Sequence, residues 1–424
     1  MLKALNNNTA ITDPSSQQKR APRGVASLAL LAAAVGTATP TSAVELWEGS
    51  DLTVKLAQHF QSVEADSSDG AVAASESADN FTPGDTNAAF MRPRFNLEFS
   101  LQFTPWLSAF VDIAEEPNDF GGSDPFSIEN DLTFLDVGLL KAVGSNAADR
   151  NSVTLRLGTP VGTLWNFRGY SDGAAVQGNP LIGNTPFDPV DAFTGAQILG
   201  THQVGGVVES VGWDIAVLTG NFNEDTRGDR GTDINLRGRI ALAGGLKIGA
   251  AYVTTDNENG ATSAFFNGNG DNVSLADTAS PSGRETHFAF FDANRDVRDF
   301  GVDSDAWQID GEYSYEDRLT ARAWYAEAEE DTNNLELSNV GVEGQLYLSP
   351  DELYVASRYT RVENESDGIS GDDTLDRIQV GGGAWLAENT LLKVEYIRQN
   401  EEQNARSRVG DDWDGVLVEL STAL

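Results

Sequence analysis

The feature that most constrains this chain is a strict alternation of apolar and polar side chains, repeated in segments of about ten residues. The clearest segment runs from Met91 to Phe103. One set of alternate positions is Pro93, Phe95, Leu97, Phe99, Leu101 and Phe103, and the other is Arg92, Arg94, Asn96, Glu98, Ser100 and Gln102. Because successive side chains of a strand point to opposite faces, this pattern predicts a β-strand with one apolar and one polar surface.

The length of the segment favours a strand that crosses a membrane. Strands of water-soluble sheets usually have about five or six residues, whereas a strand that crosses a bilayer at a tilt needs about nine to eleven. The segment 91–103 matches the longer class. No stretch beyond residue 43 is apolar for about eighteen residues in a row, the length a membrane-spanning helix requires. The sequence therefore predicts a crossing by strands.

Segments of this kind recur along the whole chain, separated by turn residues. We expect strands at 52–56, 91–103, 107–113, 133–139, 153–157, 201–209, 212–220, 233–242, 246–255, 304–315, 318–327, 339–348, 352–362, 374–386, 390–399 and 412–424. An open sheet edge in hydrocarbon would leave unpaired N–H and C=O groups, each costing several kcal/mol. The prediction is an all-β fold, a closed transmembrane antiparallel β-barrel of about 16 strands, with 18 possible if an extra hairpin lies within 256–301.

The connections between these segments are of two kinds. Brief turns such as Thr104-Pro105 and Ala387-Glu388-Asn389 alternate with long polar stretches. In bacterial outer-membrane barrels the short turns face the periplasm and the long loops face outside. We therefore expect short periplasmic turns at one rim and long extracellular loops at the other.

The first 43 residues have the layout of a secretory signal. Lys19, Arg20 and Arg23 precede an apolar run from Val25 to Val35, and Thr41-Ser42-Ala43 follows as a small-residue cleavage site. The apolar run is too short to cross a bilayer of about 30 Å. We expect a signal peptide over 1–43 and a single barrel domain over 44–424.

Composition excludes several classes of function. The chain has no cysteine, and its formal net charge of −37 repels phosphate backbones, so neither a cysteine-based centre nor nucleic acid is expected. His59, His202 and His287 lack ligand spacing, and no nucleophile elbow or phosphate-binding glycine loop is present. We expect no catalytic residues, no metal site and no cofactor, with at most loosely bound divalent cations at the acidic segments 327–331 and 363–376.

The last segment ends on an apolar residue without a polar tail. Val416, Val418, Leu420 and Leu424 share one face with Thr422, which looks like the C-terminal sorting strand of outer-membrane barrel proteins. With the signal, the alternating strands and the two kinds of connection, the chain resembles the trimeric sixteen-stranded outer-membrane porins of bacteria. The resemblance implies a water-filled channel for passive diffusion of small hydrophilic solutes, a homotrimer, and contacts with outer-membrane lipid and lipopolysaccharide.

Arginines recur on the polar faces of the expected strands. The clearest are Arg92, Arg94, Arg156, Arg237 and Arg239, and Arg322, Arg358 and Arg377 are further candidates. An arginine at the lipid-facing midplane costs about 2–4 kcal/mol, so we expect these side chains to line the lumen. There they would attract anions, because a guanidinium offers fixed donors suited to carboxylate or phosphate. The alternative is that they pair with wall carboxylates such as Glu98 or Asp136.

The segment 160–200 is the most distinctive of the long connections. It is rich in glycine and proline and carries Arg168 early and Asp188 and Asp191 late. In the porins that the chain resembles, the third long loop folds into the barrel and narrows it. The resemblance implies a constriction loop here, with Asp188 and Asp191 facing the arginine wall. The alternative is a loop that covers the surface or a neighbouring subunit.

Two other functions stay open on the sequence. An eighteen-stranded barrel would be closer to the sugar-specific porins, and Phe265-Phe266 in the segment 256–301 could stack on sugar rings. A non-conducting exported β protein is the other, either a plugged barrel or a binding protein with a sandwich core.

Overall fold

The computed structural model describes residues 47–66, 86–90, 94–115, 129–159, 162–163, 177–183, 190–191, 194–219, 232–256, 303–316, 318–330, 335–349, 352–364, 373–402 and 412–423. The expected signal peptide lies outside these ranges. Within these ranges the chain forms nineteen strands and two short helices: β1 (Ser50–Asp66), β2 (Thr86–Phe90), β3 (Arg94–Thr104), β4 (Leu107–Glu115), β5 (Glu129–Gly138), α1 (Leu139–Ala142), η3 (Asn146–Asp149), β6 (Asn151–Gly158), β7 (Gly162–Thr163), β8 (Val190–Asp191), β9 (Gly195–Gly205), β10 (Val208–Thr219), β11 (Thr232–Leu242), β12 (Leu246–Asp256), β13 (Asp303–Tyr315), β14 (Leu319–Glu330), β15 (Leu335–Ser349), β16 (Leu353–Asn364), β17 (Asp373–Ala387), β18 (Thr390–Glu402) and β19 (Asp412–Ala423).

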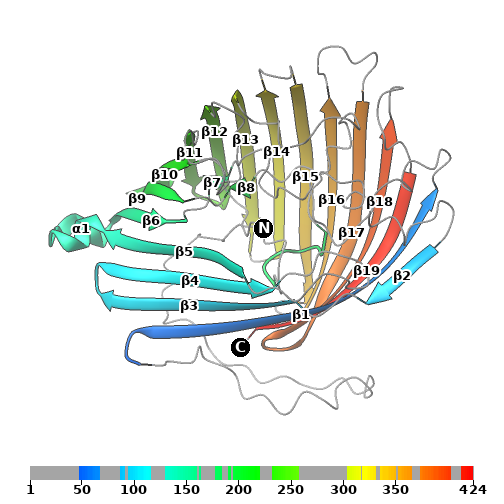
Figure 1. Cartoon of the computed structure of the whole chain (residues 1–424), viewed down its shortest axis with the longest axis horizontal. Helices are drawn as coiled ribbons and strands as arrows, with labels where there is room; N and C mark the ends of the chain where they lie inside the picture. The colour runs from blue at the N-terminus through cyan, green and yellow to red at the C-terminus, as the bar shows by residue number, and fades with distance from the viewer. Residues whose placement is uncertain are drawn as a thin grey trace, which may run out of the picture.

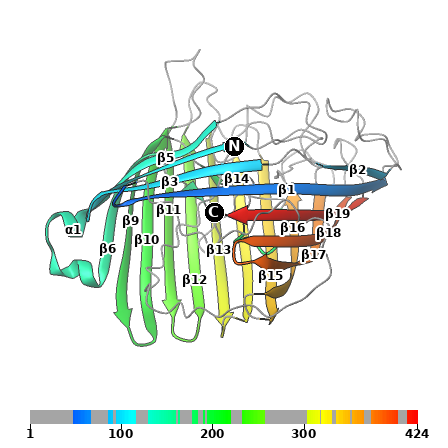
Figure 2. The ribbon, with the colours of Figure 1, turned by 90° about the horizontal axis from the view of Figure 1, so that it is seen from below.

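The wall is one closed antiparallel sheet (Figure 1). Both β2 and β3 pair with β1, β3 beside its first half and β2 beside its second, so these two strands are parts of a single wall strand. The wall therefore has sixteen strands, with β7 and β8 forming a separate small ladder. On its other side β1 pairs with β19, from Lys55 opposite Ala423 to Asp66 opposite Asp412, and this pairing closes the barrel (Figure 2).

Closure confirms the prediction of a sixteen-stranded antiparallel barrel. The sandwich alternative is wrong, because a single sheet that returns to its first strand has no second layer. The eighteen-stranded alternative is wrong as well. The two strands that flank 257–302, β12 and β13, pair directly from Leu246 opposite Tyr313 to Asp256 opposite Asp303, so no hairpin intervenes between them in the wall. No helix within the described ranges is long and apolar enough to cross a membrane.

The boundary between the sixth and seventh wall strands differs from the prediction. The sequence pattern places a turn at 210–211, whereas β9 ends at Gly205 and β10 begins at Val208. Gly205 and Gly206 have φ values of 89° and 84°, the left-handed conformation that a tight hairpin turn requires and that glycine adopts without steric cost. Val204 and Val207 extend the apolar pattern through the turn, which is why alternation alone misplaces it.

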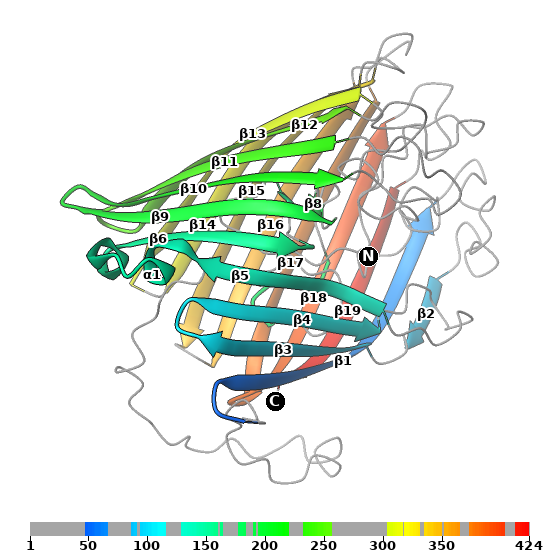
Figure 3. The same ribbon diagram turned by 60° about the vertical axis from the view of Figure 1, so that its left-hand side comes forward.

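A helical excursion joins the fourth and fifth wall strands, where the sequence predicted a strand up to residue 139. Strand β5 ends at Gly138, and Leu139–Ala142 forms α1. The helix η3 follows, and the Ser145 Oγ caps it by accepting the Ala147 N–H at 3.2 Å. Figure 3 shows α1 at the same rim as the turn between β9 and β10. This rim therefore carries one longer connection among its tight turns.

Candidate functional site

The outward face of the wall is an apolar band. Large apolar side chains alternate with inward residues on strand after strand, and each exposes more than a third of its surface: Ile215, Val217, Ile234, Leu236, Ile240, Ile248, Ile309, Val340, Val342, Leu346, Val355, Ile378, Val380, Val394 and Val416. An exposed apolar surface that continues around so much of a wall would be unstable in water and is suited to lipid. The prediction that the apolar positions of the strands face outward holds for these residues.

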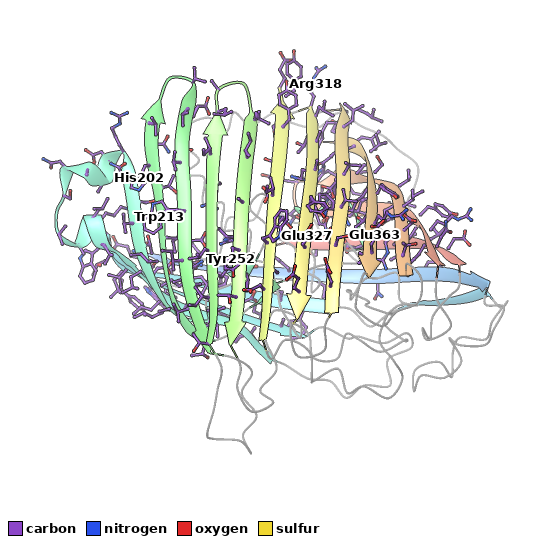
Figure 4. The ribbon with its side chains drawn as sticks, turned by 90° about the horizontal axis from the view of Figure 1, so that it is seen from above. His202, Trp213, Tyr252, Arg318, Glu327 and Glu363 are labelled. Carbon is purple, nitrogen blue, oxygen red and sulfur yellow. The ribbon has the colours of Figure 1, made fainter. Side chains whose placement is uncertain are left out.

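Aromatic hydroxyl groups and carboxylates follow the apolar band at one end. Tyr252 Oη donates to Asp305 Oδ1 at 2.5 Å, and Tyr325 Oη donates to Glu327 Oε1 at 2.5 Å. Trp307 Nε1 donates to the other oxygen of Glu327 at 3.1 Å (Figure 4). Aromatic side chains with one polar end are typical of the boundary between membrane and water. These pairs therefore mark one edge of the apolar band.

The inward face carries a charged belt across five neighbouring strands, β12 to β16. Its members stand directly opposite one another, and Lys247 Nζ lies 2.7 Å from Glu312 Oε1. Arg322 joins Glu312 at 2.8 Å and Glu343 at 2.5 Å, and Arg358 reaches Glu343 at 2.7 Å. Cations and carboxylates alternate along the belt. Each of its two carboxylates is shared by two cations, so the belt is strongly polar and its five side chains carry one more positive than negative charge.

A segment of seven residues, 177–183, lies against the continuation of this belt on β16–β18; we call it the inner segment. The Gly183 carbonyl accepts from Arg358 Nη1 and from Gln379 Nε2, each at 2.9 Å. In return, Glu395 Oε2 accepts the Gly183 N–H at 2.9 Å and the Ile182 N–H. A carboxylate that accepts two backbone N–H groups forms charge-assisted hydrogen bonds, which are stronger than neutral ones. The inner segment is thus held by both its donors and its acceptors.

Apolar contacts add to these hydrogen bonds. The buried Leu181 packs in a cluster with Tyr354, Ala356 and Leu391, all on the inward faces of β16 and β18. Gln177 Nε2 donates to the Asn389 carbonyl at 2.8 Å. In sequence the inner segment precedes β9, and β9 and β17 stand eight positions apart in the sixteen-membered wall. Residues 177–183, which lie between β6 and β9 in sequence, therefore contact the wall opposite those strands.

Two of the predicted lumen arginines are paired with wall carboxylates. Arg156 makes a two-pronged contact with Asp136, with Nε at 2.7 Å and Nη2 at 2.8 Å, and its guanidinium lies 3.7 Å from the ring centroid of Phe134. Arg237 Nε lies 2.9 Å and 3.0 Å from the two carboxylate oxygens of Asp214. For these two residues the pairing alternative describes the geometry, and Asp136 is one of the partners that the sequence suggested.

Of the other predicted site residues, Arg239, Arg94 and Asp191 lie on described strands. Arg239 lies on the inward face of β11 beside Arg237, and no ion pair joins it to any residue within the described ranges. Arg94 pairs with Ala57 through its position in β3, but its side chain is not described. Arg92, Arg168 and Asp188 lie outside the described residues. Asp191 stands opposite Gly162 in the small ladder of β7 and β8, and nothing further is described of it.

Three inward carboxylates that hold arginines or the inner segment were not singled out by the sequence pattern. Glu312, Glu343 and Glu395 are each almost fully buried on the inward face. The signal that could have found them is the register of the tight hairpins, because Glu312 and Arg322 stand opposite each other across the turn between β13 and β14. Within the described ranges, no group of three or more histidine, aspartate or glutamate side chains is arranged to hold a metal ion.

Comparison with known proteins identifies the fold. OmpF of Salmonella typhi, in complex with daunomycin, has a TM-score of 0.53 and 14% identity over 89% of this chain and 98% of that chain. The outer membrane channel DcaP of Acinetobacter baumannii has a TM-score of 0.52 and 11% identity over 90% of this chain and 100% of that chain. No protein-family model and no curated protein sequence matches. The chain has the fold of the sixteen-stranded outer-membrane porins, and its apolar outer band is suited to a membrane.

Proposed function

We propose that this protein is a porin, a water-filled channel through which small hydrophilic solutes diffuse passively across the outer membrane. The observation that carries the proposal is the opposite polarity of the two faces of one closed wall: the outside is apolar, and the inside holds the charged belt. A barrel of sixteen strands is too wide for its own wall side chains to fill and leaves an aqueous lumen. The rim with tight turns then faces the periplasm.

The segment 160–200 acts as the constriction of this channel. Support comes from the inner segment, which lies against the inward faces of β16–β18, opposite β6 and β9, and is held there at Glu395 and Arg358. Anchored chain inside the lumen reduces the area open to solutes and shifts the path toward the wall that it does not cover. In this proposal Arg168, Asp188 and Asp191 belong to the constriction and help to set its charge.

A local preference for anions is the second part of the proposal. Arg156 and Arg237 are neutralised by their carboxylate partners, so a net positive field must come from arginines without such a partner. Arg239 is the described candidate, and Arg92 and Arg94 are candidates on the sequence. Because an uncompensated cation in a narrow aqueous channel raises the local concentration of anions, a few such side chains are sufficient.

The proposed setting is a homotrimer in contact with outer-membrane lipid and lipopolysaccharide. The aromatic and acidic edge of the apolar band lies at the height where lipid head groups begin, and divalent cations would bind loosely at the acidic segments 327–331 and 363–376. The proposal includes no catalytic activity and no resident cofactor, because a diffusion channel requires neither.

The test is reconstitution of the purified full chain in a planar lipid bilayer. A channel gives stepwise increases of conductance, and the same preparation changes its mobility on a gel after boiling, since a closed barrel resists denaturation until it is heated. A folded, heat-modifiable barrel that never gives conductance steps would instead support the plugged alternative. Block of the current by oligosaccharides but not by anions would favour a sugar channel.

A further inference from the structure

Arg239 on the inward face of β11 lies between two glycines, and we call its position over Gly212 its seat. Its directly opposite neighbours are Gly212 on β10 and Gly249 on β12, so no side chain flanks it at its own height. A Cβ atom at Gly212 would lie 2.5 Å from Arg239 Nε and 2.8 Å from its Cγ. Such a close approach means that the side chain of Arg239 lies flat on the bare backbone of β10.

The charges around Arg239 are already engaged elsewhere. Arg237 is held by Asp214 at 2.9 Å, and Lys247 is held by Glu312 at 2.7 Å. A guanidinium carries five N–H donors and cannot be deprotonated in proteins. In the part of the chain that the structure describes, no carboxylate forms an ion pair with Arg239, and the nearby Asp214 is held by Arg237.

The other inward arginines show by contrast what a neutralised site looks like. Arg322 bridges Glu312 and Glu343, and Arg358 is bonded to Glu343 and to the Gly183 carbonyl of the inner segment. These arginines are positioned by acceptors of the protein itself. Arg239 instead lies over Gly212, and none of the described carboxylates forms an ion pair with its guanidinium.

We propose that Arg239, seated on Gly212, is a transient binding site for the oxyanion group, carboxylate or phosphate, of solutes that pass through the lumen. A guanidinium binds two oxygens of such a group at once, which a spherical ion such as chloride cannot match. The neighbouring inward positions Gly249, Ala241 and Ala251 are small and leave room for the rest of the solute. A single weak site also suits conduction, because a solute must leave as readily as it enters.

The proposal rests on the proposed function and is tested in the same apparatus. Single-channel current in potassium chloride is recorded while inorganic phosphate or acetate is added, and the concentration that gives half of the maximal current reduction is measured. The variants are Arg239→Gln, Arg239→Lys, Gly212→Ala and Gly238→Ala. A Cβ at Gly238 meets nothing within 4 Å, so Gly238→Ala is a matched control on the same strand as Arg239.

We expect Arg239→Gln to raise the half-effect concentration of both anions about tenfold, since charge-assisted hydrogen bonds contribute about 1.5–3 kcal/mol. Gly212→Ala should raise it as well, because the methyl group displaces the guanidinium from its seat. Arg239→Lys should give an intermediate value, because lysine keeps the positive charge but cannot donate two parallel hydrogen bonds to one oxyanion group. Gly238→Ala should leave it unchanged.

The outcomes separate this inference from the function on which it rests. Absence of conductance steps in the unaltered protein would count against the channel itself. Normal steps with the same half-effect concentration in the unaltered protein and in Arg239→Gln would overturn the oxyanion site and leave the channel standing. Only variants with heat-modifiable mobility are compared. Both Arg239→Gln and Gly212→Ala should raise the half-effect concentration, the first by removing the guanidinium and the second by displacing it.

Discussion

Glu395 is the residue on which the inner segment most depends. Its Oε2 accepts two backbone N–H groups of that segment, and its Oε1 accepts from Gln379 Nε2 at 2.8 Å. The carboxylate lies among buried groups on β16–β18, where unpaired donors are costly. One side chain therefore couples a long connection to the wall opposite its origin.

Replacing Glu395 by alanine should release the inner segment. The loss of its charge-assisted hydrogen bonds removes about 3 kcal/mol of docking free energy, and Arg358 loses a nearby opposite charge. We expect a higher single-channel conductance and more frequent current fluctuations. Glu327→Ala on the outward face of β14 is the control and should leave conductance unchanged. Equal conductance in Glu395→Ala and the unaltered protein would show that the segment does not limit the channel.

Arg92 and Arg94 are expected to contribute to the ion selectivity of the channel. Joint replacement of both by alanine should shift the reversal potential in a salt gradient toward cations, because two positive charges leave the polar face of that strand. Arg398→Ala is the control, since Arg398 lies on the outward face of β18 and donates to Asn400 at 3.1 Å. An unchanged reversal potential in the double variant would remove both residues from the selectivity of the channel.

At the scale of the strands, aromatic rings repeatedly lie over a glycine on the neighbouring strand. Trp213 stands opposite Gly200, Trp324 opposite Gly341, and Tyr354 opposite Gly383. In each pair a Cβ at the glycine would lie within 2.5 Å of a ring atom. A ring that covers a bare stretch of backbone shields the ladder hydrogen bonds and fixes the register of the two strands.

The pair of β9 and β10 provides the clearest test of this arrangement. Gly200→Ala should displace Trp213 and break its hydrogen bond to His202, in which Trp213 Nε1 donates to His202 Nε2 at 3.0 Å (Figure 4). Overpacking of this kind costs about 1–3 kcal/mol of the free energy of unfolding. The measurement is the temperature at which heat-modifiable mobility is lost.

A matched control for this strand pair is available on β15. Gly344 also faces outward, and a Cβ there meets nothing within 4 Å, so Gly344→Ala should keep the transition temperature of the unaltered protein. If Gly200→Ala and Gly344→Ala lost heat-modifiable mobility at the same temperature, the packing of the ring on glycine would not contribute to the stability of the wall.

At the scale of the whole molecule, the seam between β1 and β19 decides whether the wall is closed. Leu56 on β1 stands directly opposite Thr422 on β19, and paired residues of antiparallel strands have Cα atoms about 4.5–5.5 Å apart. That separation suits a disulfide. Because the chain has no cysteine, a pair introduced here has no competing partner.

We expect the double variant Leu56→Cys, Thr422→Cys to form an intramolecular disulfide in the folded barrel. The cross-linked chain should run faster on a non-reducing gel after boiling, since its ends are joined. The control pair is Leu56→Cys with Val418→Cys, because Val418 stands opposite Phe60, about 13 Å along the strand from Leu56. Cross-linking of the control pair but not of the test pair would contradict this register.

Arg237 and Arg239 have the same position in the sequence pattern but different surroundings in the structure. Alternation places both side chains on the same face of one strand, because a period of two leaves no other choice. It does not predict that Arg237 is neutralised and that Arg239 has a bare seat, because that depends on Asp214 and Gly212 of β10. A shift of one residue in register would exchange those neighbours, and a displaced turn is enough to produce it.

Alternation and segment length by themselves indicated long two-faced strands that suit a membrane barrel, since these features follow from local geometry and from the thickness of the bilayer. The closure of the sheet excluded a sandwich, and the direct pairing of β12 with β13 excluded an eighteen-stranded wall. Tertiary structure alone decided which arginine meets which carboxylate, where β9 turns into β10, and that residues 177–183 reach Arg358 across the barrel. Those contacts join residues far apart in the chain, and local pattern holds no information about distances through the interior.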